Sequence, residues 1–206
     1  TTMPFTPDNI YHIYNQGNNR QTIFCTRKDY LTFLNLYKRL IAAKCDTIAW
    51  CLMPNHFHFM IYTDDRCNTL TKQGNLLLDP ITNGIRKLLS GYARIFNTQN
   101  GQTGSVFRQK TKHKCLSEIE IKPGNKFSTG DYYTNCFHYI HQNPLVAKLA
   151  DKLEEWEFSS FQDYSNLRKG TLCNKELAVK YCNFDVDLFI KNSNELLKEN
   201  ISAFFD

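Results

Sequence analysis

The sequence predicts an α+β fold in which helices pack on an antiparallel sheet. Segments with strand and helix patterns follow one another in the order β-α-β-β-α-β-α. Two apolar strands flank the short turn Met53-Pro54-Asn55, so a hairpin is their natural arrangement. A chain of 206 residues, 42% hydrophobic and 14% aromatic, is long enough for one domain with a real core. This order of split βαβ units is typical of a ferredoxin-like sheet with helices on one side, and it places the first strand and the second hairpin strand at the centre.

The N-terminal half predicts a strand, a helix and the hairpin. Residues 9–16 are rich in β-forming side chains. Large apolar residues recur at helical spacing over 26–44, and Thr26 with Asp29 forms a capping pattern at the start. The apolar strand 47–52 then leads through the turn into the second hairpin strand, which begins at His56.

Further along, residues 63–75 predict a polar loop with room for a short helical turn. Asp79 followed by Pro80 marks a helix start, because a carboxylate can cap the helix and proline suits its first position. The apolar stripe of this helix extends to residue 95. A strand is expected over 106–115.

The remaining chain predicts a surface loop, a helix and a helical tail. The loop covers 117–130, which contains Pro123 and two glycines. Asp131 is expected to cap a helix that ends at Asn143, before Pro144. The tail has amphipathic helical patterns over 174–182 and 185–199. We therefore divide the chain into a catalytic domain, 1–164, and a helical C-terminal extension, 165–206.

Composition narrows the class of protein. The net charge of +5 permits an anionic partner such as nucleic acid without requiring one. The eight cysteines include no C-x-x-C pair, so a zinc ribbon or finger has little support. No basic stretch followed by an apolar one opens the given sequence, and it contains no apolar run of about 18 residues that could span a bilayer. We expect an intracellular protein of the bacterial cytoplasmic type, with reduced thiols.

The second hairpin strand carries two histidines on one face. Successive strand side chains point to opposite faces, so His56, His58, Met60 and Tyr62 lie together, and Phe57, Phe59 and Ile61 form a core face. Two imidazoles at i and i+2 are close enough to grip one divalent cation. Two half-buried histidines satisfied by hydrogen bonds would give the same pattern, and the short motif alone favours that interpretation.

A tyrosine and an asparagine share one face of the helix expected after 131. Tyr139 and Asn143 are at i and i+4, about one turn apart. An amide oxygen can ligate Mg²⁺ or Mn²⁺ beside neutral imidazoles, and a phenol can act as a covalent nucleophile. Taken alone, an ordinary core tyrosine and a C-terminal asparagine cap are the simpler interpretation.

The strand 106–115 carries a row of cations. If the segment is extended throughout, Arg108, Lys110, Lys112 and Lys114 project from one face. Such a row suits either an edge strand protected from aggregation or a surface that follows phosphates. The strand pattern by itself favours neither.

Several short blocks carry a resemblance to a known family. Pro54-Asn55-His56-Phe57-His58 is similar to the His-hydrophobic-His motif of the HUH single-strand DNA endonucleases. The run from Tyr139 to Ala147 resembles the Tyr-Ile-x-x-Asn-Pro block of their single-tyrosine transposase branch, and within it the REP-associated tyrosine transposase-like proteins. Further blocks at 11–20, 104–108 and 156–161 follow in the same order, so the resemblance spans residues 8–164.

The resemblance implies roles for individual residues. Tyr139 would attack a phosphodiester in single-stranded DNA, which leaves a 5′-phosphotyrosine link and a free 3′-OH. His56, His58 and Asn143 would bind Mg²⁺ or Mn²⁺, although related insertion-sequence transposases have glutamine at the third position. Residues expected to contact a DNA hairpin or its phosphates are Asn18, Asn19, Arg20, Arg108, Lys110, Lys112 and Lys114. Gln16-Gly17-Asn18 stands where some relatives have Arg-Gly-Asn, which puts the choice of hairpin in doubt.

Three functions compete on this evidence. The first is a metal-dependent DNA strand transferase with a tyrosine nucleophile, and the second is a domesticated protein that binds DNA hairpins without cutting them. A zinc hydrolase of small molecules is the third, but the usual extra carboxylate or cysteine ligands are missing. The sequence leaves the DNA target, the metal and the choice between monomer and homodimer open.

Overall fold

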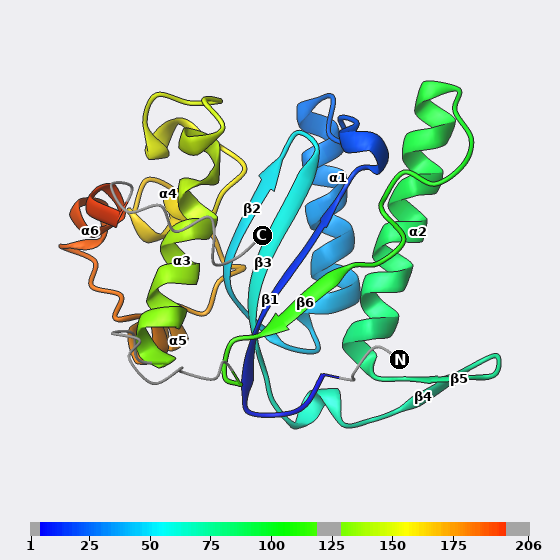
Figure 1. Ribbon diagram of the computed structural model, residues 1–206, viewed down its shortest axis with the longest axis horizontal. Helices are drawn as coiled ribbons and strands as arrows, with labels where there is room; N and C mark the ends of the chain where they lie inside the picture. Colours follow the sequence, from blue (N-terminus) through cyan, green and yellow to red (C-terminus); the bar gives the residue numbers. More distant parts are fainter. Residues whose placement is uncertain (1–4, 119–128, 197–206) are drawn as a thin grey trace.

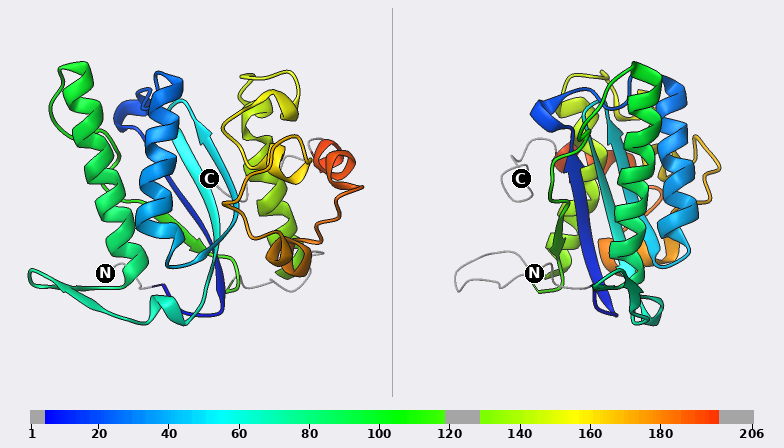
Figure 2. Two further views of the ribbon diagram at one scale, coloured as in Figure 1. Left: turned by 180° about the vertical axis from the view of Figure 1, so that it is seen from behind. Right: turned by 90° about the vertical axis from the view of Figure 1, so that its right-hand side faces the viewer.

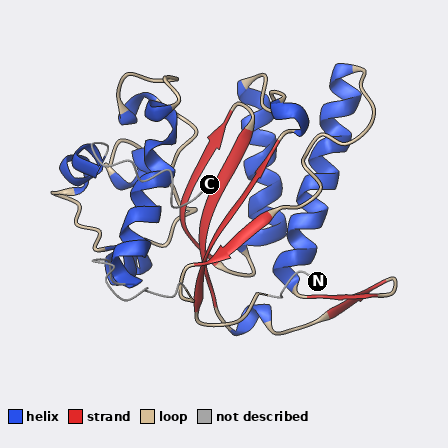
Figure 3. Cartoon of the chain, viewed as in Figure 1, coloured by secondary structure: helices blue, strands red, loops and turns tan. Residues whose placement is uncertain are grey.

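An antiparallel sheet forms the centre of the molecule. The computed structural model describes residues 5–118 and 129–196. The sheet contains β1 (Asn9–Gln16), β2 (Asp46–Met53), β3 (His56–Thr63) and β6 (Lys112–Cys115), in the order β2-β3-β1-β6. All neighbouring strands are antiparallel. The predicted α+β class is confirmed, and the first strand and the His-x-His strand occupy the centre as expected (Figure 3).

Helices cover both faces of this sheet (Figures 1 and 2). One face packs against α1 (Arg27–Tyr37), which continues as a π-turn to Ala42, and against α2 (Pro80–Asn100). The other face packs against α3 (Thr129–Val146). The short helices α4 (Phe161–Tyr164), α5 (Lys175–Cys182) and α6 (Phe189–Leu196) lie on the α3 side. The expectation that the helices lie on one side was wrong, because both faces of the sheet are apolar and each needs a cover.

Two hydrophobic cores result from this arrangement. Phe57, Phe59 and Ile61 lie in the core beneath α1 and α2, as the strand alternation predicted. The Phe59 ring stacks on Tyr37 with centroids 3.9 Å apart. The second core contains Met60 from β3 and Ile140 from α3. The side of β3 that carries the histidines therefore faces α3.

The predicted starts of α1 and α2 are confirmed. The carboxylate of Asp79 accepts hydrogen bonds from the backbone nitrogens of Ile81 (3.0 Å) and Thr82 (2.8 Å), with Pro80 at the first helical position. The Asp29 carboxylate accepts from the Thr26 nitrogen at 2.8 Å. These capping contacts are local, which is why the sequence pattern was sufficient to find them.

A projecting hairpin replaces part of the expected loop at 63–75. The strands β4 (Thr71–Gln73) and β5 (Leu76–Leu78) pair across a turn at Gly74, whose φ is 62° (Figure 1). A left-handed glycine followed by asparagine suits a two-residue hairpin turn. The expected short helical turn is present at Asp65–Cys67.

Two expectations for the helix after 131 were wrong. The helix α3 begins at Thr129, so Asp131 lies within its first turn and is not the residue before it. It also continues through Pro144 to Val146. A proline this close to a C-terminus removes one hydrogen bond but has little helix left to break.

Most of the predicted loop over 117–130 lies outside the described residues, as does the end of the tail pattern over 185–199. The described part of the C-terminal extension contains α5 and α6, and Ala178, Cys182 and Phe189 belong to the second core. Asn174 caps α5 by accepting from the Leu177 nitrogen at 3.3 Å. No helix within the described ranges is long and apolar enough to cross a membrane.

Candidate active site

The two motif histidines lie on the sheet face that α3 covers. His58 is 3% exposed, and His56, nearer the turn, is half-buried. Their rings are perpendicular, with centroids 5.0 Å apart. The strand alternation of β3 produces this placement directly.

The helix α3 brings Tyr139 to His58. Tyr139 is 8% exposed, and its ring meets the His58 ring edge-on, with centroids 5.6 Å apart and planes at 85°. It also lies edge-on to His12, at 6.1 Å. A phenol and an imidazole from opposite sides of the second core therefore lie next to each other.

Asn143 follows one turn later on α3 and is half-buried. Its amide nitrogen donates to the backbone carbonyl of Tyr139 at 2.8 Å. This bond uses Nδ2 and leaves the lone pairs of Oδ1, which is the atom a hard cation would use. The structure thus brings Tyr139 to His58 and carries Asn143 on the same helix.

His12 on β1 belongs to the same cluster, although the sequence assigned it no role. Its Nε2 lies 2.9 Å from Nδ1 of His58, and the two rings stack with centroids 5.1 Å apart. In the register of β1 and β3, Tyr14 is opposite His58 and His12 is opposite Met60. The alternation of β1 places His12 and Tyr14 on one face, but only this register shows that the face is that of His58.

Burial keeps these imidazoles neutral. It lowers the pKa of His12 to about 3, and the positive charge of Lys114 acts in the same direction. The pKa of His58 is well below its ordinary value, again mainly through burial and then through the neighbouring His12 and His56. A neutral imidazole retains a lone pair, which is the state a metal requires of it.

The turn at 17–20, which was predicted to contact DNA, is hydrogen-bonded to the residue before His56. The Gly17 nitrogen donates to the Asn55 carbonyl at 2.8 Å, and a Cβ at Gly17 would lie 2.4 Å from the Gln21 oxygen. The Asn18 side chain donates to the Ser105 carbonyl at 3.1 Å. Asn19 and Arg20 have positive φ values of 52° and 58°, and both are exposed.

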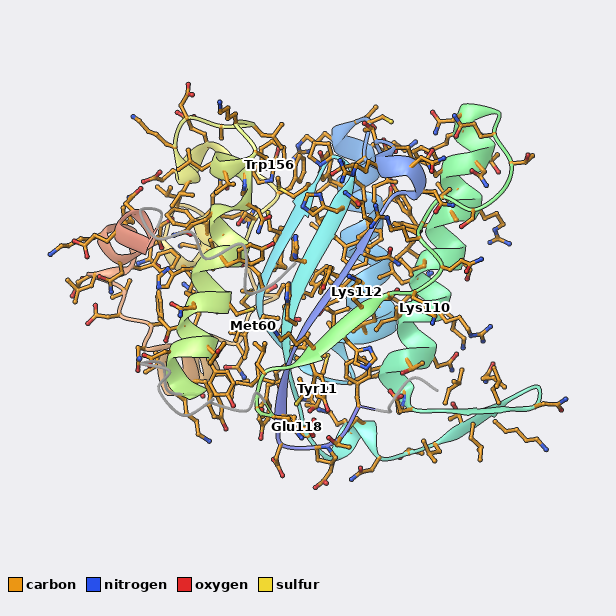
Figure 4. The ribbon with its side chains drawn as sticks, viewed as in Figure 1. Tyr11, Met60, Lys110, Lys112, Glu118 and Trp156 are labelled. Carbon is orange, nitrogen blue, oxygen red and sulfur yellow. The ribbon has the colours of Figure 1, made fainter. Side chains whose placement is uncertain are left out.

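The basic segment differs from the expected continuous strand. Only Lys112–Cys115 form β6, and Arg108 and Lys110 precede it. Lys110 and Lys112 are labelled in Figure 4. The Asn15 side chain contacts the segment that precedes β6, because its amide nitrogen donates to the Arg108 carbonyl (3.2 Å) and to Thr111 Oγ1 (2.9 Å). All four basic residues are exposed.

Two of these cations are on the histidine face. Lys112 pairs across the strands with Tyr14, and Lys114 pairs with His12. Directly opposite residues share a face of the sheet. The row of positive charge therefore borders the cluster that contains His58 and Tyr139.

The predicted donor atoms, two imidazole nitrogens and one amide oxygen, are of kinds that bind divalent cations. Among the described residues there is no group of three or more His, Cys, Asp or Glu side chains suited to one ion. The predicted set has two histidines and an amide instead. Nε2 of His58 is buried and makes no hydrogen bond within the described part of the chain, and a cation would satisfy such an atom.

Comparison with known proteins supports the fold. No protein-family model matches the sequence, and no curated protein matches it. The fold is similar to the solved structure of a REP-associated tyrosine transposase bound to a REP hairpin, with a TM-score of 0.50 and 14% sequence identity. The alignment covers 84% of this chain and 93% of that one. At this identity, the similarity concerns the fold, and residue roles rest on the geometry above.

Proposed function

We propose that the protein is a metal-dependent single-stranded DNA endonuclease and strand transferase of the transposase type, with Tyr139 as its nucleophile. The observation that carries the proposal is the contact between Tyr139 on α3 and His58 on β3. The similarity of the fold to a REP-associated tyrosine transposase supports it. The substrate would be hairpin or palindromic DNA.

In the proposed reaction, the Tyr139 oxygen attacks a phosphorus atom of the strand. The bond from phosphorus to the 3′ oxygen breaks, the phenolic proton is lost, and the 3′ oxygen leaves as a hydroxyl. The 5′ phosphate remains esterified to the tyrosine. Because this ester preserves the energy of the phosphodiester, a second DNA 3′-OH can reverse the step without ATP.

His56, His58 and Asn143 would hold Mg²⁺ or Mn²⁺. A bound divalent ion supplies positive charge that neutralises and polarises the scissile phosphate. The protein's own contribution is positional. The sheet fixes the two imidazoles, and the rigid helix fixes the phenol and the amide one turn apart.

The DNA would lie along the exposed cations beside this cluster. Lys112 and Lys114 border it on β6, and Arg108 and Lys110 extend the positive surface. The turn at Asn18, Asn19 and Arg20 would contact the hairpin, with Asn18 serving chiefly to hold the turn in place through Ser105.

The domain division and the ferredoxin-like assignment are part of the same proposal. The order β2-β3-β1-β6 with antiparallel neighbours is what two split βαβ units give. Residues 1–164 would form the catalytic domain. Residues 165–206 would be an extension whose described helices α5 and α6 pack against α3.

Replacement of Tyr139 by phenylalanine tests the function. Incubation of the protein with hairpin oligonucleotides and Mg²⁺ or Mn²⁺ should give a covalent protein–DNA adduct on denaturing gels. Tyr139→Phe should abolish the adduct while hairpin binding survives. Tyr133→Phe is the matched control on α3 and should retain the adduct, because the Tyr133 hydroxyl bonds to Ser117 (3.1 Å).

Two results would contradict the proposal. A phosphotyrosine adduct that persists in Tyr139→Phe would assign the nucleophile elsewhere. Hairpin binding by the unaltered protein with neither ion supporting cleavage would favour the domesticated, non-cleaving DNA-binding protein.

A further inference from the structure

The exposed side of α2 carries positive charge only. Residues 80–117 contain seven Lys and Arg residues and no Asp or Glu, although the whole chain contains 20 acidic residues. Three of the seven cations, Arg86, Lys87 and Arg94, are on α2, and all three are exposed. A solvated helix face usually carries both signs of charge, with opposite charges three or four residues apart. The composition of α2 therefore differs from that of an ordinary solvated helix.

These cations share one face of the helix. The residues on this face, which we call the α2 basic face, are Arg86, Lys87, Ser90, Gly91 and Arg94. At 3.6 residues per turn they occupy an arc of about 140°. The buried Leu88 and Tyr92 lie on the opposite side, where α2 packs on the first core. Because α2 forms one flank of the molecule (Figures 1 and 2), its basic face is open to a partner.

The cations of the α2 basic face form no ion pair within the described part of the chain. None of the ion pairs found there includes a residue of α2. Arg86 instead donates to the amide oxygens of Asn83 (3.3 Å) and Gln73 (3.4 Å). Burial lowers the pKa of Lys44, and the nearby charge of Lys87 lowers it further. Like charges thus gather here, and a polyanion would relieve their repulsion.

Gly91 lies in the middle of this face without a reason in the protein's own packing. A Cβ at Gly91 would have no atom within 4 Å apart from its own helix backbone and chain neighbours, whereas a Cβ at Gly84 would lie 2.5 Å from the Leu40 carbonyl oxygen. Gly84 is therefore required where α2 packs against the chain after α1. A glycine inside a helix is less favourable than alanine. The open position at Gly91 suits the close approach of a partner to the helix backbone.

The spacing and the residue types of this face match the backbone of a DNA duplex. Lys87 and Arg94 lie about 11 Å apart along the helix axis, and the major groove of B-DNA is about 12 Å wide. These two side chains can therefore reach the phosphates on both sides of one groove. Arg, Lys and Ser are common phosphate contacts. Single-strand sites add aromatic side chains on which bases stack, and the α2 basic face has none.

We propose that the α2 basic face binds the phosphate backbone of duplex DNA through Lys87 and Arg94, as a contact surface separate from the cleavage site. The helices α2 and α3 cover opposite faces of the sheet, so this surface is not the one that carries Tyr139. The segment between α2 and β6 carries the exposed Arg108 and Lys110, and an unpaired strand that leaves the duplex would follow them to the histidine face. The choice of DNA among polyanions rests on the proposed function, but duplex binding itself needs neither Tyr139 nor a metal.

Duplex binding in the presence of a metal chelator tests the inference. The probe is a blunt DNA duplex of about two helical turns without unpaired ends, and fluorescence anisotropy measures its affinity at several salt concentrations. Lys87→Gln and Arg94→Gln should each reduce the slope of log affinity against log salt by about 0.9, which is roughly an eightfold loss near 0.1 M salt. Gly91→Glu places a better helix former at the open position and should weaken binding at least as much, because its carboxylate would face a phosphate.

Two controls separate this contact from net charge and from folding. Lys191→Gln removes the same charge from another exposed helical position, on α6, and should leave the duplex affinity and its slope unchanged. Far-UV circular dichroism and the urea midpoint should be the same in Lys87→Gln, Arg94→Gln and the unaltered protein, because both side chains are exposed.

Three results would overturn the inference: no duplex binding by the unaltered protein at low salt, unchanged affinity in both Lys87→Gln and Arg94→Gln, or an equal loss in Lys191→Gln. A larger loss for a single strand of the same sequence than for the duplex in these two α2 variants would also overturn it, because the face would then be a single-strand site. Duplex binding through α2 without any covalent adduct leaves the inference standing and refutes the proposed function. An adduct through Tyr139 without duplex binding on α2 does the reverse.

Discussion

Two further histidines on α3 show how burial controls a side chain's role. Nδ1 of His138 lies 2.9 Å from Ser193 Oγ, and Nε2 of His141 lies 2.7 Å from Ser160 Oγ. Burial lowers the pKa of His138 to about 4 and that of His141 well below its ordinary value. These imidazoles link α3 to residues that follow it, and we assign them a structural role.

The burial of His138 and His141 predicts that the folded protein becomes less stable in acid. The unfolded chain takes up protons below the ordinary histidine pKa of about 6.5, whereas the folded protein resists protonation until its lowered pKa is reached. The contribution of these two histidines to the free energy of unfolding should therefore be complete above pH 6.5 and be lost as the pH decreases. For His138 alone, the loss between pH 7 and pH 5 should be roughly 2 kcal/mol.

Urea unfolding at pH 7 and pH 5 measures this loss. His138→Gln can keep a hydrogen bond to Ser193 but cannot titrate, so its pH dependence should be smaller by the share of His138. An equal pH dependence in the variant and the unaltered protein would show that His138 is not buried in its neutral form.

At the scale of elements, β6 is both an edge strand of the sheet and a border of the histidine face. It is an edge of the sheet, next to β1, and its exposed lysines at 112 and 114 protect that edge from further pairing. The same lysines border the histidine face. Lys112 also lies 5.7 Å from the centre of the Tyr14 ring, which packs against His58.

If DNA follows this edge, binding should depend on salt through these lysines. Lys112→Gln and Lys114→Gln should each weaken binding of single-stranded DNA, and each should reduce the slope of log affinity against log salt by about 0.7. Fluorescence anisotropy at several salt concentrations measures both. Lys191→Gln on α6, which is exposed and lies outside the basic row on residues 108–114, is the control and should leave the slope unchanged. An unaltered slope in both β6 variants would place the DNA elsewhere.

The opposite edge of the sheet is covered by the chain itself. The Leu52 nitrogen donates to the Phe158 carbonyl at 2.8 Å, and the Ser160 nitrogen donates to the Trp50 carbonyl at 2.9 Å. Trp156 adds a bond from its indole nitrogen to the Leu52 carbonyl at 3.1 Å (Figure 4). Residues 156–161, one of the blocks of the family resemblance, thus have a structural role, since they cover the edge of β2.

At the scale of the whole molecule, Arg168 joins the C-terminal extension to the rest of the chain. Its guanidinium donates to the Asp163 carboxylate (2.6 Å) and to the carbonyls of Glu157 and Ser159 (2.6 Å each). The Asp163 side chain is 2% exposed. One side chain therefore holds the segment that covers β2.

Arg168→Ala should strongly destabilise the protein, because it leaves a buried carboxylate unpaired. The expected loss in free energy of unfolding is about 3–5 kcal/mol, measured by urea denaturation at pH 7. Arg27→Ala, which breaks an exposed pair with Glu157, is the control and should have little effect. Similar small losses in both variants would mean that Arg168 does not anchor the segment.

The sequence alone determined the features that depend on neighbours along the chain. Strand alternation placed His56 and His58 on one face, and helical spacing placed Tyr139 and Asn143 together. The caps at Asp29 and Asp79 were equally local. These patterns repeat every two to four residues, so they can be recognised without knowledge of the rest of the fold.

Only the tertiary structure decided how the elements meet. It placed α3 on the face opposite α1 and α2, set the register that joins His12 to His58, and shortened the basic strand where Asn15 bonds to Arg108 and Thr111. Such choices depend on the joint packing of segments far apart in the chain, and a shift of one residue would turn every side chain of a strand to the other face.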